Sequence, residues 1–284
     1  MRKKIFIRLK GGLGNQLFIY AFGLAQSKRL GADLVIDNIS GFGNKFDEYK
    51  SEYALGSLNL TKYLISGILL KHLVANKYFW HAARVLGFCH VEKTDGKYED
   101  VSETKNMFYE GYWQSFRYFH EHRALLRNNL IAKDHQSMVN AEYRDLIQQA
   151  TTSVAVGMRF YEETKSASLH HTVKTAEFYR NAIQHIERSV STATYFIFST
   201  DLTRAREVMD KINVKNVVYI EPVRGKRDAI YDLYLMMLCQ NFVISNGTFY
   251  WWAAYLGEKP ESKVVAPDQG FANSDALPPS WIRI

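Results

Sequence analysis

"IRLKGGLGNQLFIYAFGLAQSKRLGADLVID", residues 7–37, has the order of a strand, a glycine turn, a helix and a second strand that ends in an acid, Asp37. This order is typical of the first βαβ unit of a nucleotide-binding fold. A dinucleotide fingerprint also needs a third glycine three residues after the second, and Leu17 stands at that position. A P-loop is excluded as well, because no Lys-Ser or Lys-Thr pair follows the glycines. The stretch therefore predicts a Rossmann-type unit and counts against NAD binding.

The glycine turn can still form a ligand site. Gly12 and Gly14 bring backbone N–H groups and the start of the helix close to a ligand. The side-chain amides of Asn15 and Gln16 offer hydrogen-bond donors and acceptors that suit a hydroxyl-rich ligand. In the alternative interpretation, Asn15 caps the helix and Gln16 belongs to its first solvated turn. Both interpretations stay open at this point.

Eight short runs rich in β-branched or aromatic residues predict strands. They are residues 4–9, 32–37, 106–112, 153–159, 194–200, 216–221, 241–246 and 263–267. Helices are predicted to about residue 90 and over 117–149, 175–188, 202–212, 227–239 and 248–256. The regular alternation in the second half indicates an α/β fold with parallel sheets. A chain of 284 residues is long for one core, so we expect two lobes, residues 1–150 and residues 151–284.

The composition indicates a globular protein of a reducing compartment. Two cysteines, Cys89 and Cys239, cannot form a disulfide framework. The first apolar run is too short for a signal peptide, so we expect a cytoplasmic protein. The net charge of +7 favours phosphorylated ligands or an anionic membrane face. No nucleic-acid partner is expected, because the basic residues are scattered and no nucleic-acid motif is present.

Five segments carry a family resemblance. They are "GGLGNQLFIYAFGLA" (11–25), "GYWQSFRYF" (111–119), "EFYRNAIQHI" (177–186), "FIFSTD" (196–201) and "DLYLMMLCQNFVISNGTFYWWAAYLG" (232–257). In this order they resemble the bacterial α-1,2-fucosyltransferases of glycosyltransferase family 11. The resemblance implies a GT-B-like arrangement of two Rossmann-type lobes whose parallel sheets face a central cleft. It also implies that the first lobe lies on the acceptor side, that the second holds GDP-fucose, and that transfer inverts the anomeric carbon without a metal ion.

The sequence itself offers no metal site for such a reaction. It contains no Asp-x-Asp triplet of the kind that holds a divalent ion on a nucleotide diphosphate. The adjacent His170 and His171 are interpreted as loop or surface residues, because no carboxylate or thiol stands at ligand spacing. We therefore expect no metal and no cofactor besides the nucleotide-sugar substrate.

One segment departs from the family. The family's arginine motif reads His-x-Arg-Arg-x-Asp, whereas residues 157–163 read "GMRFYEE". Arg159 keeps the first arginine of the motif. Gly157, Phe160 and Glu162 replace the histidine, the second arginine and the acid. The change leaves the donor sugar and the linkage open.

Arg159 is the first candidate for binding the sugar donor. Breaking the bond to a nucleotide diphosphate builds negative charge on the leaving phosphate, and a guanidinium can bind two of its oxygens. Arg159 follows a predicted strand, at the end where open α/β sheets bind ligands. The alternative is a surface arginine that pairs with Glu162 or Glu163.

A second contact with the sugar donor is expected at the turn before the tryptophan helix. Its residues are Asn246, Gly247, Thr248 and Phe249. The N-terminus of the helix that they open can bind an anion. The alternative is that Thr248 only caps the helix and that the tryptophans fill the core. Asp201, after another strand, either accepts hydrogen bonds from guanine, as the resemblance implies, or caps the next helix.

The acceptor hydroxyl must lose its proton, and a carboxylate or histidine is the usual base. Glu162 occupies the position of the family's acid. Glu163, Asp37 and Glu110 are competing candidates. The choice among these carboxylates stays open.

The leading hypothesis is a metal-independent, inverting fucosyltransferase that uses GDP-fucose to extend a bacterial surface glycan. Its acceptor is expected to be an oligosaccharide, carried on a lipid at the inner membrane face, with peripheral membrane contact through the basic charge. A second hypothesis keeps the fold and the reaction type but changes the donor sugar or the linkage. An NAD-dependent oxidoreductase and a non-catalytic carbohydrate-binding protein are the alternatives from other classes.

Overall fold

The computed structural model describes residues 2–42, 51–58, 60, 63–65, 72–73, 76–93, 97–101, 107–131, 139–162, 164–190, 192–222, 228–271 and 275–284. The chain divides into two compact units. Unit 1 comprises residues 1–132 and 272–277, and unit 2 comprises residues 133–271 and 278–284. This division comes earlier than the boundary predicted at residue 150, because helix α6 (Ala141–Gln149) belongs to unit 2. There the Tyr143 hydroxyl accepts a hydrogen bond from the Glu221 backbone N–H at 3.1 Å.

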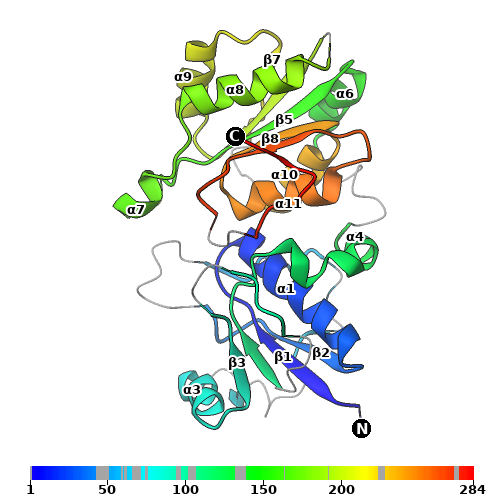
Figure 1. Ribbon diagram of the computed structural model, residues 1–284, viewed down its shortest axis with the longest axis vertical. Coiled ribbons are helices and arrows are strands. Elements are labelled where there is room, and N and C mark those ends of the chain that lie inside the picture. The colour runs from blue at the N-terminus through cyan, green and yellow to red at the C-terminus, as the bar shows by residue number, and fades with distance from the viewer. Residues whose placement is uncertain are drawn as a thin grey trace. The chain divides into compact units, whose positions relative to one another are not determined.

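Unit 1 is built on a four-stranded parallel sheet with the strand order β2-β1-β4-β3. Its strands are β1 (Lys4–Arg8), β2 (Asp33–Asp37), β3 (Cys89–Val91) and β4 (Phe108–Glu110). Helix α1 (Leu13–Arg29) connects β1 to β2 and lies against both strands (Figure 1). The shorter helices described in this unit are α3 (Lys77–Val85), η2 (Phe116–Tyr118), η3 (His120–His122) and α4 (Arg123–Leu130). Because α1 is apolar around most of its circumference, it is buried almost from end to end.

Glycines set the start and the packing of α1. Gly11 has φ +72°, in the region that favours glycine, and Gly12 is the N-cap of the helix. Gly23 faces β1, where an added Cβ would lie 2.7 Å from Cδ1 of Ile7. In a dinucleotide fingerprint the third glycine permits this close packing of helix on strand. Here Gly23 permits it from a later turn of the helix.

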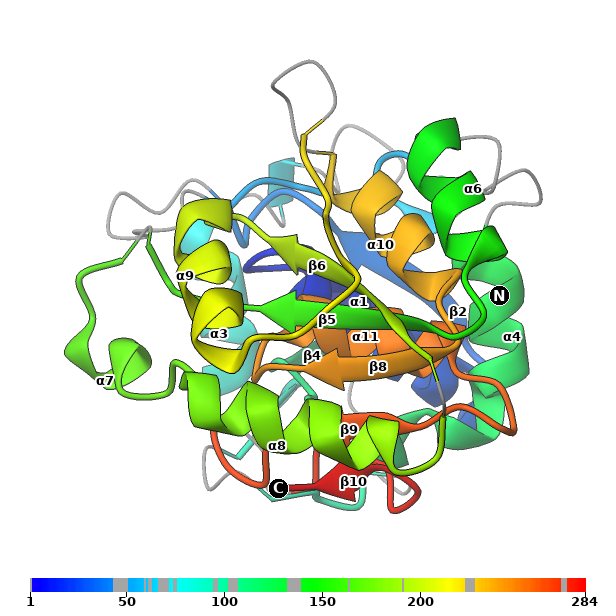
Figure 2. The ribbon, with the colours of Figure 1, turned by 90° about the horizontal axis from the view of Figure 1, so that it is seen from above.

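Unit 2 contains a six-stranded parallel sheet with the order β10-β9-β8-β5-β6-β7. Its strands are β5 (Ser153–Met158), β6 (Thr194–Ser199), β7 (Val217–Tyr219), β8 (Asn241–Ile244), β9 (Val264–Ala266) and β10 (Ile282–Arg283). Its further helices are α7 (Ala167–His170), α8 (Ala176–Glu187), α9 (Leu202–Ile212), α10 (Ala229–Met237) and α11 (Thr248–Gly257). Figure 2 shows β6, β5, β8, β9 and β10 following one another across this sheet.

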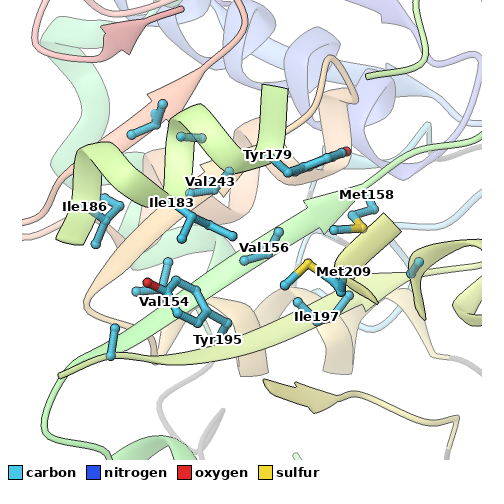
Figure 3. Packing of buried hydrophobic residues seen from close by; sticks show 14 of the residues in the cluster. Val154, Val156, Met158, Tyr179, Ile183, Ile186, Tyr195, Ile197, Met209 and Val243 are labelled. Carbon is cyan, nitrogen blue, oxygen red and sulfur yellow. The ribbon is translucent and has the colours of Figure 1, made fainter. Parts of the chain in front are cut away.

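Alternate residues of β5 face opposite layers of helices. Val154, Val156 and Met158 pack against residues of α8 and α9 (Figure 3). On the other face, a Cβ added to Gly157 would meet the ring of Tyr250 from α11 at 2.5 Å. Every residue of β5 is buried. Burial on both faces explains the uninterrupted apolar run from which this strand was predicted.

The structure confirms the predicted order of elements. All eight predicted strands are present within two residues at either end, and α8 to α11 correspond to the four helices predicted between residues 175 and 256. Strands β3 and β10 were not predicted, because their sequences, CHV and IR, contain no uninterrupted apolar run. Within 117–149, the described residues form η2, η3, α4 and α6. No helix in the described part of the chain combines the length and apolar character that a membrane span requires.

Candidate functional site

The carboxyl ends of β5, β6 and β8 carry most of the residues predicted to bind the sugar donor. These strands are parallel neighbours, so their carboxyl ends share one edge of the sheet. Arg159 follows β5, Asp201 follows β6 and Asn246 follows β8. Open α/β sheets bind ligands at this edge. Unit 2 thus brings together side chains that are far apart in the sequence.

Arg159 and Glu162 form an ion pair at this edge. Nη1 of Arg159 lies 3.6 Å from Oε2 of Glu162. The other carboxylate oxygen, Oε1, accepts a hydrogen bond from the Thr200 hydroxyl after β6. The Cβ of Arg159 is 3.9 Å from the position that a Cβ on Gly247 would take. The ion pair with Glu162, the alternative role considered for Arg159, is therefore present. Arg159 also lies beside the turn that opens α11.

Asn246 and Tyr161 connect three loops beside Arg159. Nδ2 of Asn246 donates to the Tyr161 hydroxyl at 3.1 Å and to Oγ1 of Thr172 at 2.8 Å. It also lies 3.3 Å from the Gly270 carbonyl oxygen. Tyr161 adopts φ +56°, and its ring centroid lies 4.7 Å from the guanidinium carbon of Arg159. Such backbone strain is common at functional sites, and burial raises the pKa of Tyr161, so its hydroxyl stays protonated.

Helix α11 begins at this edge with an uncapped first turn. Its N-cap is Gly247, and no side chain caps it, so the interpretation of Thr248 as the cap is wrong. The first backbone N–H groups of a helix have no intrahelical partner and can bind an anion. Phe249 is half-buried in this turn. Trp251 and Trp252 are fully buried, which confirms that they fill the core.

Two departures from the family's arginine motif have a packing reason. A Cβ on Gly157 would come within 2.5 Å of the Tyr250 ring. The Tyr250 hydroxyl donates to the Met158 carbonyl at 2.8 Å, which holds the ring in this position. Phe160 belongs to the buried core of unit 2. The packing therefore requires a residue without a side chain at position 157 and accepts an apolar ring at position 160.

Asp201 is the N-cap of α9. Its Oδ1 accepts a hydrogen bond from the Arg204 backbone N–H at 3.0 Å, so the capping interpretation is confirmed. A contact between Asp201 and guanine stays a prediction. Glu163, a competing candidate for the base, lies outside the described residues.

In unit 1, the buried side chain of Gln16 forms a hydrogen bond with the glycine turn. Its side chain is fully buried, and Nε2 donates to the carbonyls of Gly11 at 2.7 Å and Glu52 at 2.8 Å. Its Oε1 accepts a hydrogen bond from the Ala54 backbone N–H at 2.9 Å. The interpretation of Gln16 as part of a solvated turn is therefore wrong. The amide instead links the turn to the segment 51–58.

The other candidates of the turn lie at the start of α1. Gly12 is the N-cap and no side chain caps the helix, so the interpretation of Asn15 as the cap is wrong. Oδ1 of Asn15 accepts a hydrogen bond from Nε2 of Gln114 at 2.9 Å. Gly14 is buried in the first turn. The roles of these residues toward a ligand stay predictions.

Two candidate bases of unit 1 are held by the protein itself. Asp37 is fully buried, and its oxygens accept hydrogen bonds from two backbone N–H groups, from a serine hydroxyl and from the Trp80 indole. Glu110 is also buried and forms ion pairs with Arg8 at 3.1 Å and Arg84 at 2.5 Å. Protein groups therefore already bind the oxygens of both carboxylates.

Two charged residues near the glycine turn were not predicted. Nζ of Lys10 lies 4.5 Å from the centroid of the Tyr112 ring, and burial lowers the pKa of this amine. Glu92 accepts hydrogen bonds from the backbone N–H groups of Tyr112 at 2.6 Å and Trp113 at 2.9 Å. Burial raises the pKa of the Glu92 carboxyl. Lys10 could have been found from its place next to the glycines, but no pattern marks Glu92, because its partners are main-chain groups.

The described residues contain no group of three or more histidine, cysteine, aspartate or glutamate side chains that could hold a metal ion. Nε2 of His170 donates to the Thr164 carbonyl at 2.8 Å. At the carboxyl edge of unit 2, a guanidinium, a helix N-terminus and neutral hydroxyl and amide side chains lie together with the carboxylates of Glu162 and Asp201, which accept hydrogen bonds from protein groups. The guanidinium and the helix N-terminus suit a phosphate-bearing ligand.

The chain belongs to glycosyl transferase family 11. The model of this family matches residues 60–284. The match includes all of unit 2 and starts after the glycine turn. The protein is therefore a glycosyltransferase, as the resemblance implied, and family membership counts against the oxidoreductase and the non-catalytic carbohydrate-binding protein.

Named relatives align over nearly the whole chain. The α-1,2-colitosyltransferase of Escherichia coli is 26% identical, with 99% of this chain and 98% of the relative covered. The O-antigen biosynthesis glycosyltransferase WbnK of Escherichia coli is 27% identical, with 97% and 99% covered. The structure of the α-1,6-fucosyltransferase NodZ soaked with GDP-fucose is similar with a TM-score of 0.53, at 13% identity, covering 90% of this chain and 93% of that chain. NodZ comes from Bradyrhizobium. Its similarity supports the predicted GT-B-like class of two Rossmann-type units with parallel sheets.

Proposed function

We propose that this glycosyltransferase transfers L-fucose from GDP-fucose to a hydroxyl of an acceptor glycan, with inversion and without a metal ion. The structural similarity to NodZ, a fucosyltransferase soaked with GDP-fucose, supports this donor. The name of the relative that forms α-1,2 linkages supports the same linkage here. The relative that acts in O-antigen biosynthesis supports a bacterial surface polysaccharide as the product.

The observation that carries the proposal is the position of Arg159 next to the N-terminus of α11. The Cβ of Arg159 lies 3.9 Å from the Cβ position of Gly247, the N-cap of that helix. As the sugar–phosphate bond breaks, negative charge grows on the leaving diphosphate. A guanidinium and the free N–H groups of a helix start both stabilise that charge, and neither requires a metal ion. Asn246, Thr248 and Phe249 would complete this side of the diphosphate site.

In this proposal, Glu162 has a different role from the one its motif position suggests. In an inverting displacement the acceptor attacks from the face opposite the leaving diphosphate. Glu162 is paired at 3.6 Å with the arginine that we assign to that diphosphate, so its carboxylate stands on the leaving-group side. We therefore assign Glu162 and its partner Thr200 to positioning Arg159, and we expect the base to be another group.

The acceptor is, in this proposal, an oligosaccharide repeat unit carried on a lipid at the inner face of the cytoplasmic membrane. The net charge of +7 supports peripheral contact with anionic lipids. The glycine turn of unit 1, with Gly12, Gly14 and Asn15, is then the candidate acceptor-side site. Gln16 shapes this turn through its buried amide.

A second candidate keeps the fold and the reaction type and changes the donor sugar to colitose. It is favoured by the α-1,2-colitosyltransferase, which aligns with 99% of this chain. It is also favoured by the altered motif, because Gly157 and Phe160 stand beside the arginine that we assign to the diphosphate. The two candidates differ only in the sugar that the nucleotide carries.

Single-turnover transfer assays distinguish these candidates. The enzyme is incubated with GDP-fucose or with nucleotide-activated colitose and an oligosaccharide acceptor, with and without EDTA, and the product linkage is read by NMR. Arg159→Ala should lower the transfer rate about 100- to 1000-fold, because it removes one preorganised partner of the leaving charge. Arg188→Ala, an exposed arginine directly after α8, is the matched control and should retain the rate.

A different experimental result would contradict each part of the proposal. Faster transfer of colitose would replace the fucosyl donor by the second candidate. Loss of activity in EDTA would contradict metal independence. A rate that Arg159→Ala leaves within about threefold of wild type would remove Arg159 from the site, because a lost charge-assisted contact costs more than that.

A further inference from the structure

Arg204 places a second guanidinium on the short segment that contains Arg159. Its guanidinium carbon lies 4.6 Å from the centroid of the Phe160 ring, and Phe160 is the residue after Arg159. The guanidinium of Arg159 lies 4.7 Å from the ring of Tyr161, the next residue. Arg159 follows β5, whereas Arg204 lies in the first turn of α9, after β6. Both guanidiniums therefore pack on rings of the segment 159–161.

The start of α9 determines where Arg204 lies. Asp201 caps the helix through the Arg204 backbone N–H at 3.0 Å, so Arg204 belongs to the first turn. The Ser199 hydroxyl accepts a hydrogen bond from the Asp201 backbone N–H at 3.2 Å, which holds the connection from β6. Because β5 and β6 are parallel neighbours, this first turn lies at the edge of the sheet that carries Arg159.

Helix stability does not account for an arginine at this position. The N-terminus of a helix carries partial positive charge, so a cation in the first turn is unfavourable. The first turn of α9 contains no acidic residue. Within the described residues, no carboxylate lies within ion-pair distance of the Arg204 guanidinium, whereas Arg206 on the same helix pairs with Glu221 at 2.7 Å. Binding of an anion at the edge of the sheet would explain an arginine at position 204, whereas the stability of the helix does not.

We propose that Arg204 binds the diphosphate of the nucleotide-sugar donor together with Arg159. This inference rests on the proposed function. A diphosphate carries at least two negative charges, whereas Arg159 shares its positive charge with Glu162 at 3.6 Å. Position 160, where the family's motif has a second arginine, holds a phenylalanine, and the ring of Phe160 supports the guanidinium of Arg204 instead. A side chain from α9 thus supplies the second cation of the diphosphate site.

Calorimetric titrations with GDP and with guanosine test this proposal. Arg204→Ala should weaken GDP binding about 10- to 100-fold, the usual effect of losing a hydrogen bond to a charged group. Guanosine binding should stay within about twofold, since guanosine carries no phosphate. Arg206→Ala is the matched control on the same helix and should leave both affinities unchanged. Phe160→Leu should weaken GDP binding by about two- to fivefold in the wild type, but not in Arg204→Ala, because the ring acts through the guanidinium.

Several results would overturn the proposal. Equal GDP affinity of wild type and Arg204→Ala would exclude the contact. An equal loss of GDP and guanosine affinity would place Arg204 at the nucleoside or at the fold, and a Phe160→Leu effect that persists without Arg204 would exclude the coupling. GDP binding that depends on Arg159 but not on Arg204 would overturn this inference alone. A wild-type protein that binds no GDP would overturn the proposed function and this inference together.

Discussion

Replacing Gly157 by alanine tests the packing reason for the altered arginine motif. The new Cβ would lie 2.5 Å from Cγ and from Cδ1 of the Tyr250 ring and 3.0 Å from its Cβ. Carbon atoms in contact lie about 3.5–4.0 Å apart, so the ring must move by roughly 1 Å or the strand must bend. The Tyr250 hydroxyl opposes such a movement, because it donates to the Met158 carbonyl at 2.8 Å. We expect Gly157→Ala to lower the free energy of unfolding by about 1–3 kcal/mol, the usual cost of overpacking.

A double-mutant cycle with Tyr250→Ala separates this contact from other effects. Tyr250→Ala alone creates a cavity and should cost about 3–5 kcal/mol. In its background the added methyl group of Gly157→Ala has room, so the two changes should show a coupling of about 1–3 kcal/mol. Gly56→Ala is the control, because among the described residues its Cβ would meet only Cε1 of Tyr53, at an ordinary 3.7 Å. It should change stability by less than about 0.5 kcal/mol.

Urea unfolding followed by tryptophan fluorescence and by circular dichroism provides these free energies. A Gly157→Ala variant as stable as wild type would show that the ring does not restrict the position. A substitution that costs as much in the Tyr250→Ala background would exclude the contact with the ring as its cause. That result would mean that the backbone of β5, and not the Tyr250 ring of α11, requires a glycine at position 157.

Two further predictions concern the glycine turn of unit 1. Gln16→Leu removes a fully buried amide with three hydrogen bonds to the main chain, so it should lower the free energy of unfolding by about 2–4 kcal/mol in urea titrations. The exposed Gln148→Leu should change it by less than about 0.5 kcal/mol, and a neutral Gln16→Leu would contradict the assigned role. Lys10→Met should stabilise the protein most at neutral pH, because burial lowers the pKa of the Lys10 amine and folding is then hindered while the amine is charged. The gain should shrink as the pH rises toward 10.5, the pKa of an unperturbed lysine, and a gain independent of pH in thermal unfolding would contradict the reasoning.

The sheets could be predicted because parallel strands buried on both faces leave a strong pattern. β5 is buried at every position, and its run of six residues was found within one residue of its end. β3 and β10 were missed, although β2 and β7, which also lie at sheet edges, were found. The sequences of β3, Cys-His-Val, and β10, Ile-Arg, contain no uninterrupted apolar run by which a strand could be recognised.

The candidate site could be predicted only where a residue's place along the chain determines its place in the fold. Arg159, Asp201 and Asn246 each follow a strand, so their presence at one edge follows from the topology. The tasks of Gln16 and Tyr161 could not be predicted. Gln16 bonds to main-chain groups near residue 52, and Tyr161 depends on a left-handed backbone conformation and on a contact with Asn246, after β8. Such contacts arise from tertiary structure and leave no local pattern.

The altered arginine motif changes the neighbours of Arg159 without removing it from the edge of the sheet. The position before Met158 is filled by the ring of Tyr250, and the position after Arg159 is a core phenylalanine that supports Arg204. At both positions the polar residue of the family's motif is absent. The residue found there instead contacts a side chain from a helix, Tyr250 of α11 at position 157 and Arg204 of α9 at position 160. We therefore expect affinity for a nucleotide diphosphate to be preserved. A change of donor sugar would then arise from side chains that border Arg159, of which Tyr161, held by Asn246, is one.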